Sequence, residues 1–359
     1  MGPVSWGADR PSRVPDPYPP RTLASVDLPD RPLLDALAAY AHAAAHRPGT
    51  PCRCAGGLVG VLADRDDGTV VRHGRLVAKA HAPGIDPEAH RARIALAAHP
   101  DVREVFLPPL TVSPPGELDG RPVSLWPYGS PVDPADPDAA PWEEAARLLA
   151  RLHRTPPPDG AAIRLPGMRA PAKAALAVDR MRRTAPDHPA AATVLAAWSS
   201  VPDGAATDGP RLLCHGDFHL GQLVRDEESA EPAEPAKSEG VPTPPSAPWR
   251  LIDPDDAGLG DPAWDLARPA AWFAAGILPP EIWSRFLGAY QEAGGPAVGA
   301  DPWAQLDVPA RALTVQTAAL AVAKSTAEGR PLDEVEDVMI DTCARIAGHR
   351  TDSAPTAST

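Results

Sequence analysis

A short segment in the second half of the chain, LLCHGDFHLGQLVRD at 212–226, concentrates side chains that handle protons and bind metals. His215, Asp217, His219 and Gln222 alternate there with apolar residues. A polar group in an apolar setting is normally paired or functional, because burying it without a partner costs free energy. The segment is therefore the first candidate for a catalytic site.

A second acidic motif follows at 251–267, with the sequence LIDPDDAGLGDPAWDLA. A carboxylate at Asp217, an amide five residues later at Gln222 and a second carboxylate at Asp253, after a strand-like segment, are the groups that phosphoryl transfer requires. One Asp accepts the hydroxyl proton, while the amide oxygen and the other carboxylate are hard ligands for Mg²⁺. The interval from Asp217 to Gln222 equals the Asp-to-Asn interval of the kinase catalytic loop.

Two metal-based alternatives compete with this interpretation. His215, Asp217 and His219 form a His-x-Asp-x-His pattern that a metal-dependent hydrolase could use, but the sequence shows no further cluster of ligands to complete such a site. Cys52 and Cys54 form a Cys-x-Cys pair without a second pair at zinc-finger spacing. Phosphoryl transfer remains the leading hypothesis.

Composition and charge restrict the partners. The chain has 359 residues, 43% of them apolar, and its 47 acidic against 34 basic residues give a net charge of -13. This charge argues against nucleic acid, whose phosphates require clustered Lys and Arg, and favours a cationic or neutral small ligand. No signal peptide and no run of about 18 apolar residues is visible, which predicts a cytoplasmic protein without a membrane segment. The oligomeric state is left open.

The first half of the chain predicts a small lobe with an antiparallel sheet at 29–128. An Ala- and Leu-rich helix is expected at 33–46. Three strands are expected within 56–81, because Asp67-Gly68 and His73-Gly74 are turn dipeptides suited to hairpins. A helix at 87–99 and a strand in RPVSLWPYGS, ending at a hinge, complete the lobe.

The second half predicts a mainly helical lobe at 129–349. Six segments have apolar residues at helical spacing. They cover 142–154, 172–183, 188–200, 282–294, 309–327 and 332–349. The proline-rich segment at 226–248 is expected to be a disordered insertion between two pairing strands, QLV and WRLID, and 1–28 and 350–359 are expected to be disordered tails.

The two motifs resemble the aminoglycoside phosphotransferase family. HGDFHLGQ and IDPDDAGLGDPAWDLA, with LVAKAH upstream and the helix LLARLHR, carry the resemblance over 56–275. The HLGQ form of the loop is similar to the maltokinase and actinobacterial glucosamine kinase branch. The resemblance implies an α+β, protein-kinase-like bilobal fold, and ATP and Mg²⁺ as cofactors.

The resemblance also implies a role for each site residue. Asp217 is expected to be the catalytic base, and Gln222 and Asp253 the metal ligands, with Asp255 as a further ligand or a substrate contact. The nucleotide is expected to contact Lys79, Gly56, Gly57 and the hinge residues Leu125, Trp126 and Tyr128. Structural support of the site is expected from His215, Asp261 and Asp265.

Three features depart from the family pattern. The helix at 87–99 has no Glu beyond Glu88, so that Lys79 lacks the expected Glu partner. Pro254 follows Asp253, and AGGLVG lacks the complete Gly-x-Gly-x-x-Gly arrangement. Gln222 stands where Asn is usual and adds a methylene.

The sequence thus predicts a small-molecule kinase that transfers the γ-phosphoryl group to a hydroxyl of an amino sugar, an aminoglycoside-like compound or a sugar-containing acceptor. The acceptor pocket is expected beyond Asp265, with Trp272, Phe273, Glu281 and Trp283. The alternative is a pseudokinase-like module that binds nucleotide without phosphotransfer. A protein kinase is disfavoured, because no activation segment ending in Ala-Pro-Glu is present.

Overall fold

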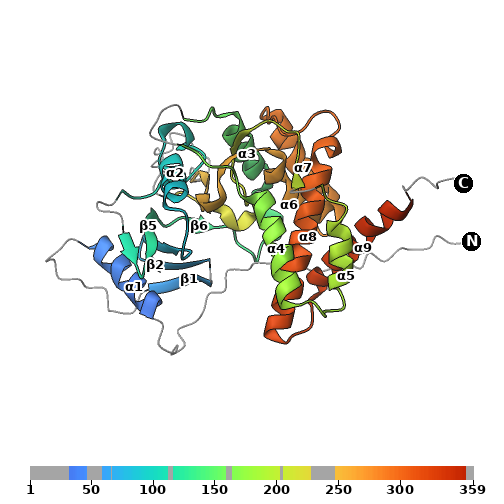
Figure 1. Ribbon diagram of the computed structural model, residues 1–359. Helices are drawn as coiled ribbons and strands as arrows, with labels where there is room; N and C mark the ends of the chain where they lie inside the picture. Colours follow the sequence, from blue (N-terminus) through green and yellow to red (C-terminus); the bar gives the residue numbers. More distant parts are fainter. Residues whose placement is uncertain are drawn as a thin grey trace, which may run out of the picture.

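The computed structural model describes residues 32–46, 59–65, 67–111, 116–158, 164–202, 205–227 and 247–352. In Figure 1 a small lobe built on a sheet lies at the left, and a larger helical lobe lies at the right. This is the two-lobed arrangement that the sequence predicts. Gly56, Gly57, most of the expected insertion and the N-terminal tail lie outside the described residues.

The small lobe is a five-stranded antiparallel sheet with the order β1-β2-β3-β5-β4. Its strands are β1 (Val59–Arg65), β2 (Gly68–His73), β3 (Leu76–His81), β4 (Gly116–Leu118) and β5 (Arg121–Pro127). The expected three strands and the strand before the hinge are confirmed. The β2-β3 turn consists of Gly74 and Arg75, one residue later than the expected His73-Gly74, and Gly74 has a φ of 60° that glycine adopts at little cost.

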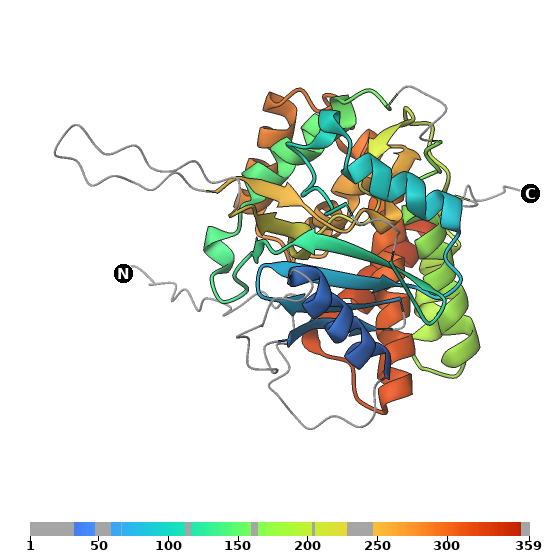
Figure 2. The same cartoon turned by 90° about the vertical axis from the view of Figure 1, so that its left-hand side faces the viewer.

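One helix, α1 (Pro32–Ala45), lies along a face of this sheet (Figure 2). Leu37 and Ala41 of α1 pack against Val71, Ala78 and Leu125 of the strands, and these five side chains are almost completely buried. Apolar residues of α1 recur every three to four positions, whereas those of the strands alternate. The small lobe therefore has a core of its own.

The helix α2 (Pro87–Ala97) joins the small lobe to the large one. Asp86 caps its first turn by accepting hydrogen bonds from the N–H groups of Glu88 and Ala89. Leu96 at its other end is buried in the core of the large lobe, and Arg93 Nε donates to the carbonyl oxygen of Ala257 at 2.8 Å. Helix α2 is thus fixed to the large lobe as well as to the sheet.

The large lobe is built from seven helices in the described part of the chain. They are α3 (Trp142–Arg154), α4 (Ala170–Thr184), α5 (Ala191–Trp198), α6 (Ala263–Ala274), α7 (Pro280–Glu292), α8 (Trp303–Glu328) and α9 (Glu334–Asp352). Helix α8 packs against α4, α5, α6 and α9 through buried alanines that allow close approach. The six predicted helices are present. Helix α9 continues to Asp352, so 350–352 are helical where a disordered tail was expected.

Two small antiparallel sheets carry the loops of the chemical motifs. β7 (Leu212–Cys214) pairs with β10 (Gly258–Gly260). β8 (Leu223–Arg225) pairs with β9 (Trp249–Leu251) and with β6 (Ser130–Pro131). The expected pairing of QLV with WRLID is therefore confirmed, and it places residues 215–222 beside residues 252–257. Over the described ranges, no helix combines the length and apolarity that crossing a membrane requires.

Candidate active site

A cavity of about 390 Å³ lies between the two lobes. The small lobe contributes Lys79 and the hinge residues Trp126 and Tyr128, while the large lobe contributes Gln222 and Asp253. Asp255 lines it as well, so six of the residues predicted to bind nucleotide or metal line one cavity, although they are distributed over more than 170 positions of the sequence.

Leu125 does not line this cavity. Its side chain is buried in the core of the small lobe, and its carbonyl oxygen accepts a hydrogen bond from the N–H of Leu110 at 2.8 Å. Side chains alternate along β5, so Trp126 faces the cavity while Leu125 faces the core, and a contact of the Leu125 backbone with nucleotide stays a prediction. The backbone N–H of Tyr128 donates to the carbonyl oxygen of Arg75.

Asp265 of α6 fixes the backbone of the loop that carries Asp217. Asp265 accepts hydrogen bonds from the backbone N–H groups of His215, at 2.6 Å, and Gly216, at 2.7 Å. His153 of α3 lies 3.0 Å from the same carboxylate and also contacts the hydroxyl of Tyr290. These contacts are the bracing expected of Asp265.

His215 connects the two loops of the site. Its Nε2 lies 2.9 Å from the carbonyl oxygen of Ile252, and its ring stacks on Phe106. His215 therefore does not turn toward Asp217 and His219 as a metal ligand, and the His-x-Asp-x-His alternative has no geometric support in the described residues. Asp261 accepts a hydrogen bond from the N–H of Ala263 and so caps the start of α6, as expected.

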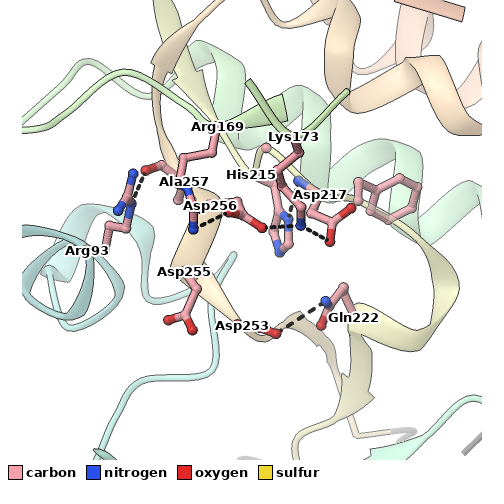
Figure 3. A network of polar contacts seen from close by, with 12 residues as sticks. Arg93, Arg169, Lys173, His215, Asp217, Gln222, Asp253, Asp255, Asp256 and Ala257 are labelled. Atoms are coloured by element: carbon pink, nitrogen blue, oxygen red, sulfur yellow. Dashed lines mark hydrogen bonds and ion pairs between the residues drawn. The ribbon is translucent and has the colours of Figure 1, made fainter. Parts of the chain in front are cut away.

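Two cations hold the carboxylate of Asp217. Lys173 of α4 donates to Oδ2 at 2.8 Å, and Arg268 of α6 donates to Oδ1 at 2.7 Å. Burial alone would raise the pKa of Asp217, but Lys173 and Arg268 outweigh it and hold this pKa well below its usual range. Asp217 is therefore ionised and fixed in orientation (Figure 3).

Lys173 also reaches a second carboxylate, Asp256, at 2.6 Å. Arg169 contacts Asp256 from the start of α4 at 3.2 Å, as Figure 3 shows. The loop residue Gly216 has a φ of 82°, and a Cβ there would lie 2.2 Å from the carbonyl oxygen of Asp256. The two loops thus approach so closely that only glycine fits at this position.

Asp253 adopts a left-handed backbone conformation, with φ at 62° and ψ at 67°. This conformation is costly for a residue other than glycine, by about 1–3 kcal/mol, and such residues concentrate at functional sites. It presents Oδ1 to Lys79 Nζ at 2.6 Å and Oδ2 to the Gln222 amide, whose Nε2 lies at 3.5 Å. The carboxylate is therefore shared between the two lobes.

This arrangement fits a magnesium ion. Two neighbouring ligands of octahedral Mg²⁺ lie about 2.9 Å apart, because each is about 2.1 Å from the metal. A half-turn of the Gln222 amide would bring Oε1 to the place of Nε2, 3.5 Å from Asp253 Oδ2, so a small approach of the two side chains would give this spacing. Gln222 and Asp253 are thus suited to hold Mg²⁺, and the additional methylene of Gln222 spans the gap between the loops.

Lys79 has a partner that the sequence did not reveal. Its ammonium contacts Asp255 Oδ2 at 2.9 Å in addition to Asp253. Burial alone would lower the pKa of Lys79, but both carboxylates raise it, so the ammonium stays charged. Asp255 takes the place of the helix Glu that is absent from α2.

Two histidines complete this cluster. His81 Nδ1 lies 2.9 Å from Asp255 Oδ2, and His81 Nε2 lies 2.7 Å from the Ser124 hydroxyl. His90 of α2 packs against His81 with the ring centroids 4.2 Å apart. Burial and the neighbouring His81 lower the pKa of His90 to about 4, so helix α2 presents a neutral ring where kinases have a Glu. The role of Asp255 as a metal ligand stays a prediction.

Sequence reasoning missed Lys173, Arg268 and Arg169. Lys173 is the only cation in the apolar stretch APAKAALAV, and Arg268 lies within LARPAAWFAA, a helix that is otherwise apolar there. A lone cation on a buried face requires a partner, and this was the signal available. Which carboxylate it meets depends on how α4 and α6 pack.

The residues expected in the acceptor pocket are arranged differently from the prediction. Trp283 is buried and stacks on Phe273, with ring centroids 5.5 Å apart. Glu281 is exposed at the start of α7, and of the four only Trp272 lines the cavity. Trp283 and Phe273 therefore contribute mainly to the core between α6 and α7, because their aromatic rings pack on each other.

Comparison with known families identifies the class. Residues 61–232 match the profile of the Phosphotransferase enzyme family, a stretch that contains Lys79, Asp217 and Gln222. The predicted class, a phosphotransferase with a hydroxyl acceptor, is thereby confirmed. The comparison with curated proteins found no relative of significant similarity.

Solved structures confirm the fold. The choline kinase LicA from Streptococcus pneumoniae has a TM-score of 0.53 at 14% identity, over 81% of this chain and 93% of that chain. The apo form of a thermostable mutant of aminoglycoside phosphotransferase APH(4)-Ia has a TM-score of 0.50 at 14% identity, over 82% and 95%. Spectinomycin phosphotransferase APH(9)-Ia, solved with ADP and spectinomycin, has a TM-score of 0.50 at 12% identity, over 81% and 92%. The chain therefore has the kinase-like bilobal fold.

Proposed function

We propose that the protein is an ATP- and Mg²⁺-dependent small-molecule kinase that phosphorylates a hydroxyl group of a sugar-containing acceptor. One observation carries the proposal. The carboxylate of Asp253, in a left-handed conformation at the cavity, is reached by Lys79 from the small lobe and by Gln222 from the loop of Asp217. Residues with the roles required for phosphoryl transfer thus converge from three segments of the chain.

Each residue then has a defined task. Lys79 binds the α- and β-phosphates, and Trp126 and Tyr128 lie where the hinge contacts the base of the nucleotide. Gln222 and Asp253 hold Mg²⁺, and Asp255 pairs with Lys79. When bound, Mg²⁺ neutralises charge on the phosphates of the nucleotide.

Asp217 orients the acceptor hydroxyl and receives its proton as the phosphoryl group is transferred. A carboxylate has about four lone-pair sites, so the contacts with Lys173 and Arg268 leave room for one more donor. A carboxylate with a lowered pKa is a weak base, and this suits a loose transition state in which the proton leaves the hydroxyl late. The reaction therefore depends on position more than on basicity.

The charges around Asp217 favour a neutral sugar within the expected range of acceptors. Three cations, Lys173, Arg169 and Arg268, surround the two carboxylates Asp217 and Asp256. A polycationic acceptor meets repulsion there, whereas a neutral hydroxyl does not. The HLGQ loop, through its similarity to the maltokinase and glucosamine kinase branch, supports a sugar as the acceptor.

The experiment is mass spectrometry of an acceptor panel after incubation with Mg²⁺-ATP. The panel contains neutral sugars, amino sugars, aminoglycosides and nucleoside antibiotics, and Asp217→Asn is tested in parallel. We expect a product 80 Da heavier, the mass of one phosphoryl group added with loss of one proton, only with the wild-type protein. Calorimetry of ATP binding with and without Mg²⁺ accompanies the panel.

The outcomes separate the proposed kinase from the pseudokinase-like alternative. Product from both proteins alike would contradict the role of Asp217. Metal-dependent ATP binding without product from any member of the panel would favour a nucleotide-binding module, and absence of ATP binding would contradict the whole assignment.

A further inference from the structure

Three histidines meet at the outer edge of the small lobe, away from the cavity between the lobes. His42 lies in the last turn of α1, His46 directly follows the last residue of that helix, and His73 is the last residue of β2. The ring centroids are 4.6 Å apart for His42 and His46, 5.0 Å for His42 and His73, and 5.4 Å for His46 and His73. This cluster could not be predicted from local sequence patterns, because His73 is 27 residues from His46.

The distances match those of a tetrahedral metal site. Ligand atoms of the three rings all lie within 4.8 Å of one another, and the Nε2 atoms of His46 and His73 are 3.2 Å apart. Two imidazole nitrogens bound to one Zn²⁺ at about 2.05 Å lie about 3.3 Å apart in tetrahedral geometry. The pair is therefore already spaced as two ligands, and a ring nitrogen of His42 lies within 4.8 Å of both as the third.

We propose that His42, His46 and His73 form a binding site for a transition-metal ion, with Zn²⁺ as the expected occupant. Three imidazoles suit Zn²⁺, Cu²⁺ and Ni²⁺, whereas Mg²⁺ and Ca²⁺ prefer oxygen ligands. The cluster contains no carboxylate among the described residues. Its nitrogen ligands therefore differ from the oxygen ligands of the proposed magnesium site at Asp253. We expect Zn²⁺ and Mg²⁺ to bind at different sites for this reason.

The surroundings favour imidazoles in the neutral form, which is the form that binds metals. His73 is 6% exposed, and His42 and His46 are partly buried by the sheet. Burial and the two neighbouring histidines lower the pKa of His73. Three protonated rings at these separations would repel one another, which disfavours the charged form. Three neutral rings can instead bind a single metal ion through one nitrogen of each.

The position of the site indicates its effect. A bound ion links α1 to β2, which pairs with β3, the strand that carries Lys79. Three protein ligands leave the fourth position to water. The metal therefore fixes the helix on the outer face of the sheet and stabilises the small lobe, and it takes no direct part in phosphoryl transfer.

A second cluster, formed by His81, His90 and Asp255, requires a control. Its ligand atoms also lie within 4.8 Å of one another, but Asp255 is already bound to Lys79 and His81. A metal there would compete with the ion pair of Lys79. We assign that cluster to the active site and use His90→Ala to distinguish the two.

The test is zinc binding to the full-length, chelator-treated protein, measured by competition with a chromophoric chelator. The bound metal is counted by elemental mass spectrometry. We expect one Zn²⁺ per chain at the histidine cluster and a rise in Tm of several degrees on zinc addition, since a ligand specific for the folded state stabilises it. His42→Gln and His46→Gln should each weaken binding at least about tenfold, the minimum loss seen when even an outer partner of a metal ligand is removed.

Matched controls identify the ligands. His90→Ala should leave zinc affinity unchanged, and so should Cys52→Ser combined with Cys54→Ser. Absorption of the Co²⁺ form gives a second measurement, because nitrogen ligands give visible bands without the near-ultraviolet charge transfer of a thiolate. The Tm of His42→Gln without metal should equal that of the wild type, which separates loss of a ligand from unfolding.

Several outcomes would overturn the proposal. These are zinc affinity that survives both glutamine substitutions, affinity lost in His90→Ala or in the double cysteine variant, or absence of zinc binding to the wild type. In each case the contact between His46 and His73 would be an ordinary N–H···N hydrogen bond.

Discussion

The two charged clusters of the active site are organised in opposite ways. Around Lys79 one cation is held by two carboxylates, Asp253 and Asp255. Around Asp217 one carboxylate is held by two cations, Lys173 and Arg268. In each cluster the central group is kept charged despite its burial, because its partners outweigh the cost of desolvation.

The clusters also differ in the elements that supply them. Lys79 belongs to the small lobe and both of its partners to the large one, so this cluster connects the lobes. Asp217 and its partners all belong to the large lobe, on the catalytic loop, α4 and α6. Relative movement of the lobes therefore alters the contacts of Lys79 and leaves those of Asp217 in place. We therefore expect nucleotide binding to respond to the relative position of the lobes, whereas the position of Asp217, the proposed base, is set within the large lobe alone.

The largest effect is expected for Asp217→Asn. The amide cannot receive the hydroxyl proton, so kcat should fall by about 10³-fold or more, within the range for removal of a general base. The Kd for Mg²⁺-ATP should change less than about threefold, because Asp217 does not line the nucleotide cavity. Steady-state kinetics and calorimetry measure the two quantities. Asp187→Asn, at an exposed position in the same lobe, is the matched control and should behave as wild type.

The next effect distinguishes Asp253 from Asp255. Asp255→Asn should weaken ATP binding about tenfold through loss of one charged partner of Lys79, and it should keep the Mg²⁺ dependence of binding. Asp253→Asn should remove that dependence. Calorimetry with and without Mg²⁺ measures both variants. If Asp255→Asn abolishes the metal dependence instead, Asp255 is a metal ligand, as the sequence predicts.

A smaller effect is expected from Lys173→Met, and it depends on pH. The wild type holds the pKa of Asp217 well below its usual range, so Asp217 stays ionised as the pH falls. Removal of one cation raises this pKa, and the acid limb of the profile of kcat/KM should move to higher pH by about one unit. Rates of wild type and variant, measured from the lowest pH at which both proteins stay folded up to pH 8, give the shift, because the acid limb lies below the usual pKa of a carboxyl group. An unchanged profile would mean that Arg268 alone keeps Asp217 ionised.

The smallest effect is expected for His90→Phe. The phenyl ring preserves packing against His81 and removes only a neutral imidazole, so kcat/KM for ATP should stay within about threefold of wild type, a change of about 0.6 kcal/mol. A loss above tenfold would show that α2 helps to fix Lys79, as the helix Glu does in kinases. The comparison of Asp255→Asn with His90→Phe therefore decides which element replaces that Glu.

Local sequence patterns predicted much of the fold. The turn between β2 and β3 follows from Gly74, whose φ is 60°, and the helices follow from apolar spacing, because both signals depend on neighbouring residues alone. The spacing of Asp217, Gln222 and Asp253, together with the family resemblance, indicated the residues expected at the site, and six of those predicted to bind nucleotide or metal line one cavity. The side chain of Leu125 faces the core instead of the cavity, because neighbouring residues of a strand point to opposite faces.

What the sequence determined by itself is the kind of chemistry, since two carboxylates and an amide at kinase spacing already predict phosphoryl transfer. The tertiary structure decided which residues form ion pairs with the charged side chains of the site. Asp255 pairs with Lys79, and both Lys173 and Arg268 pair with Asp217, although 176, 44 and 51 positions of the sequence separate the members of these pairs. The convergence of His42, His46 and His73 was decided in the same way. Ion pairs and metal ligands act through space over a few ångströms, and only the packing of helices and strands sets which distant residues come that close.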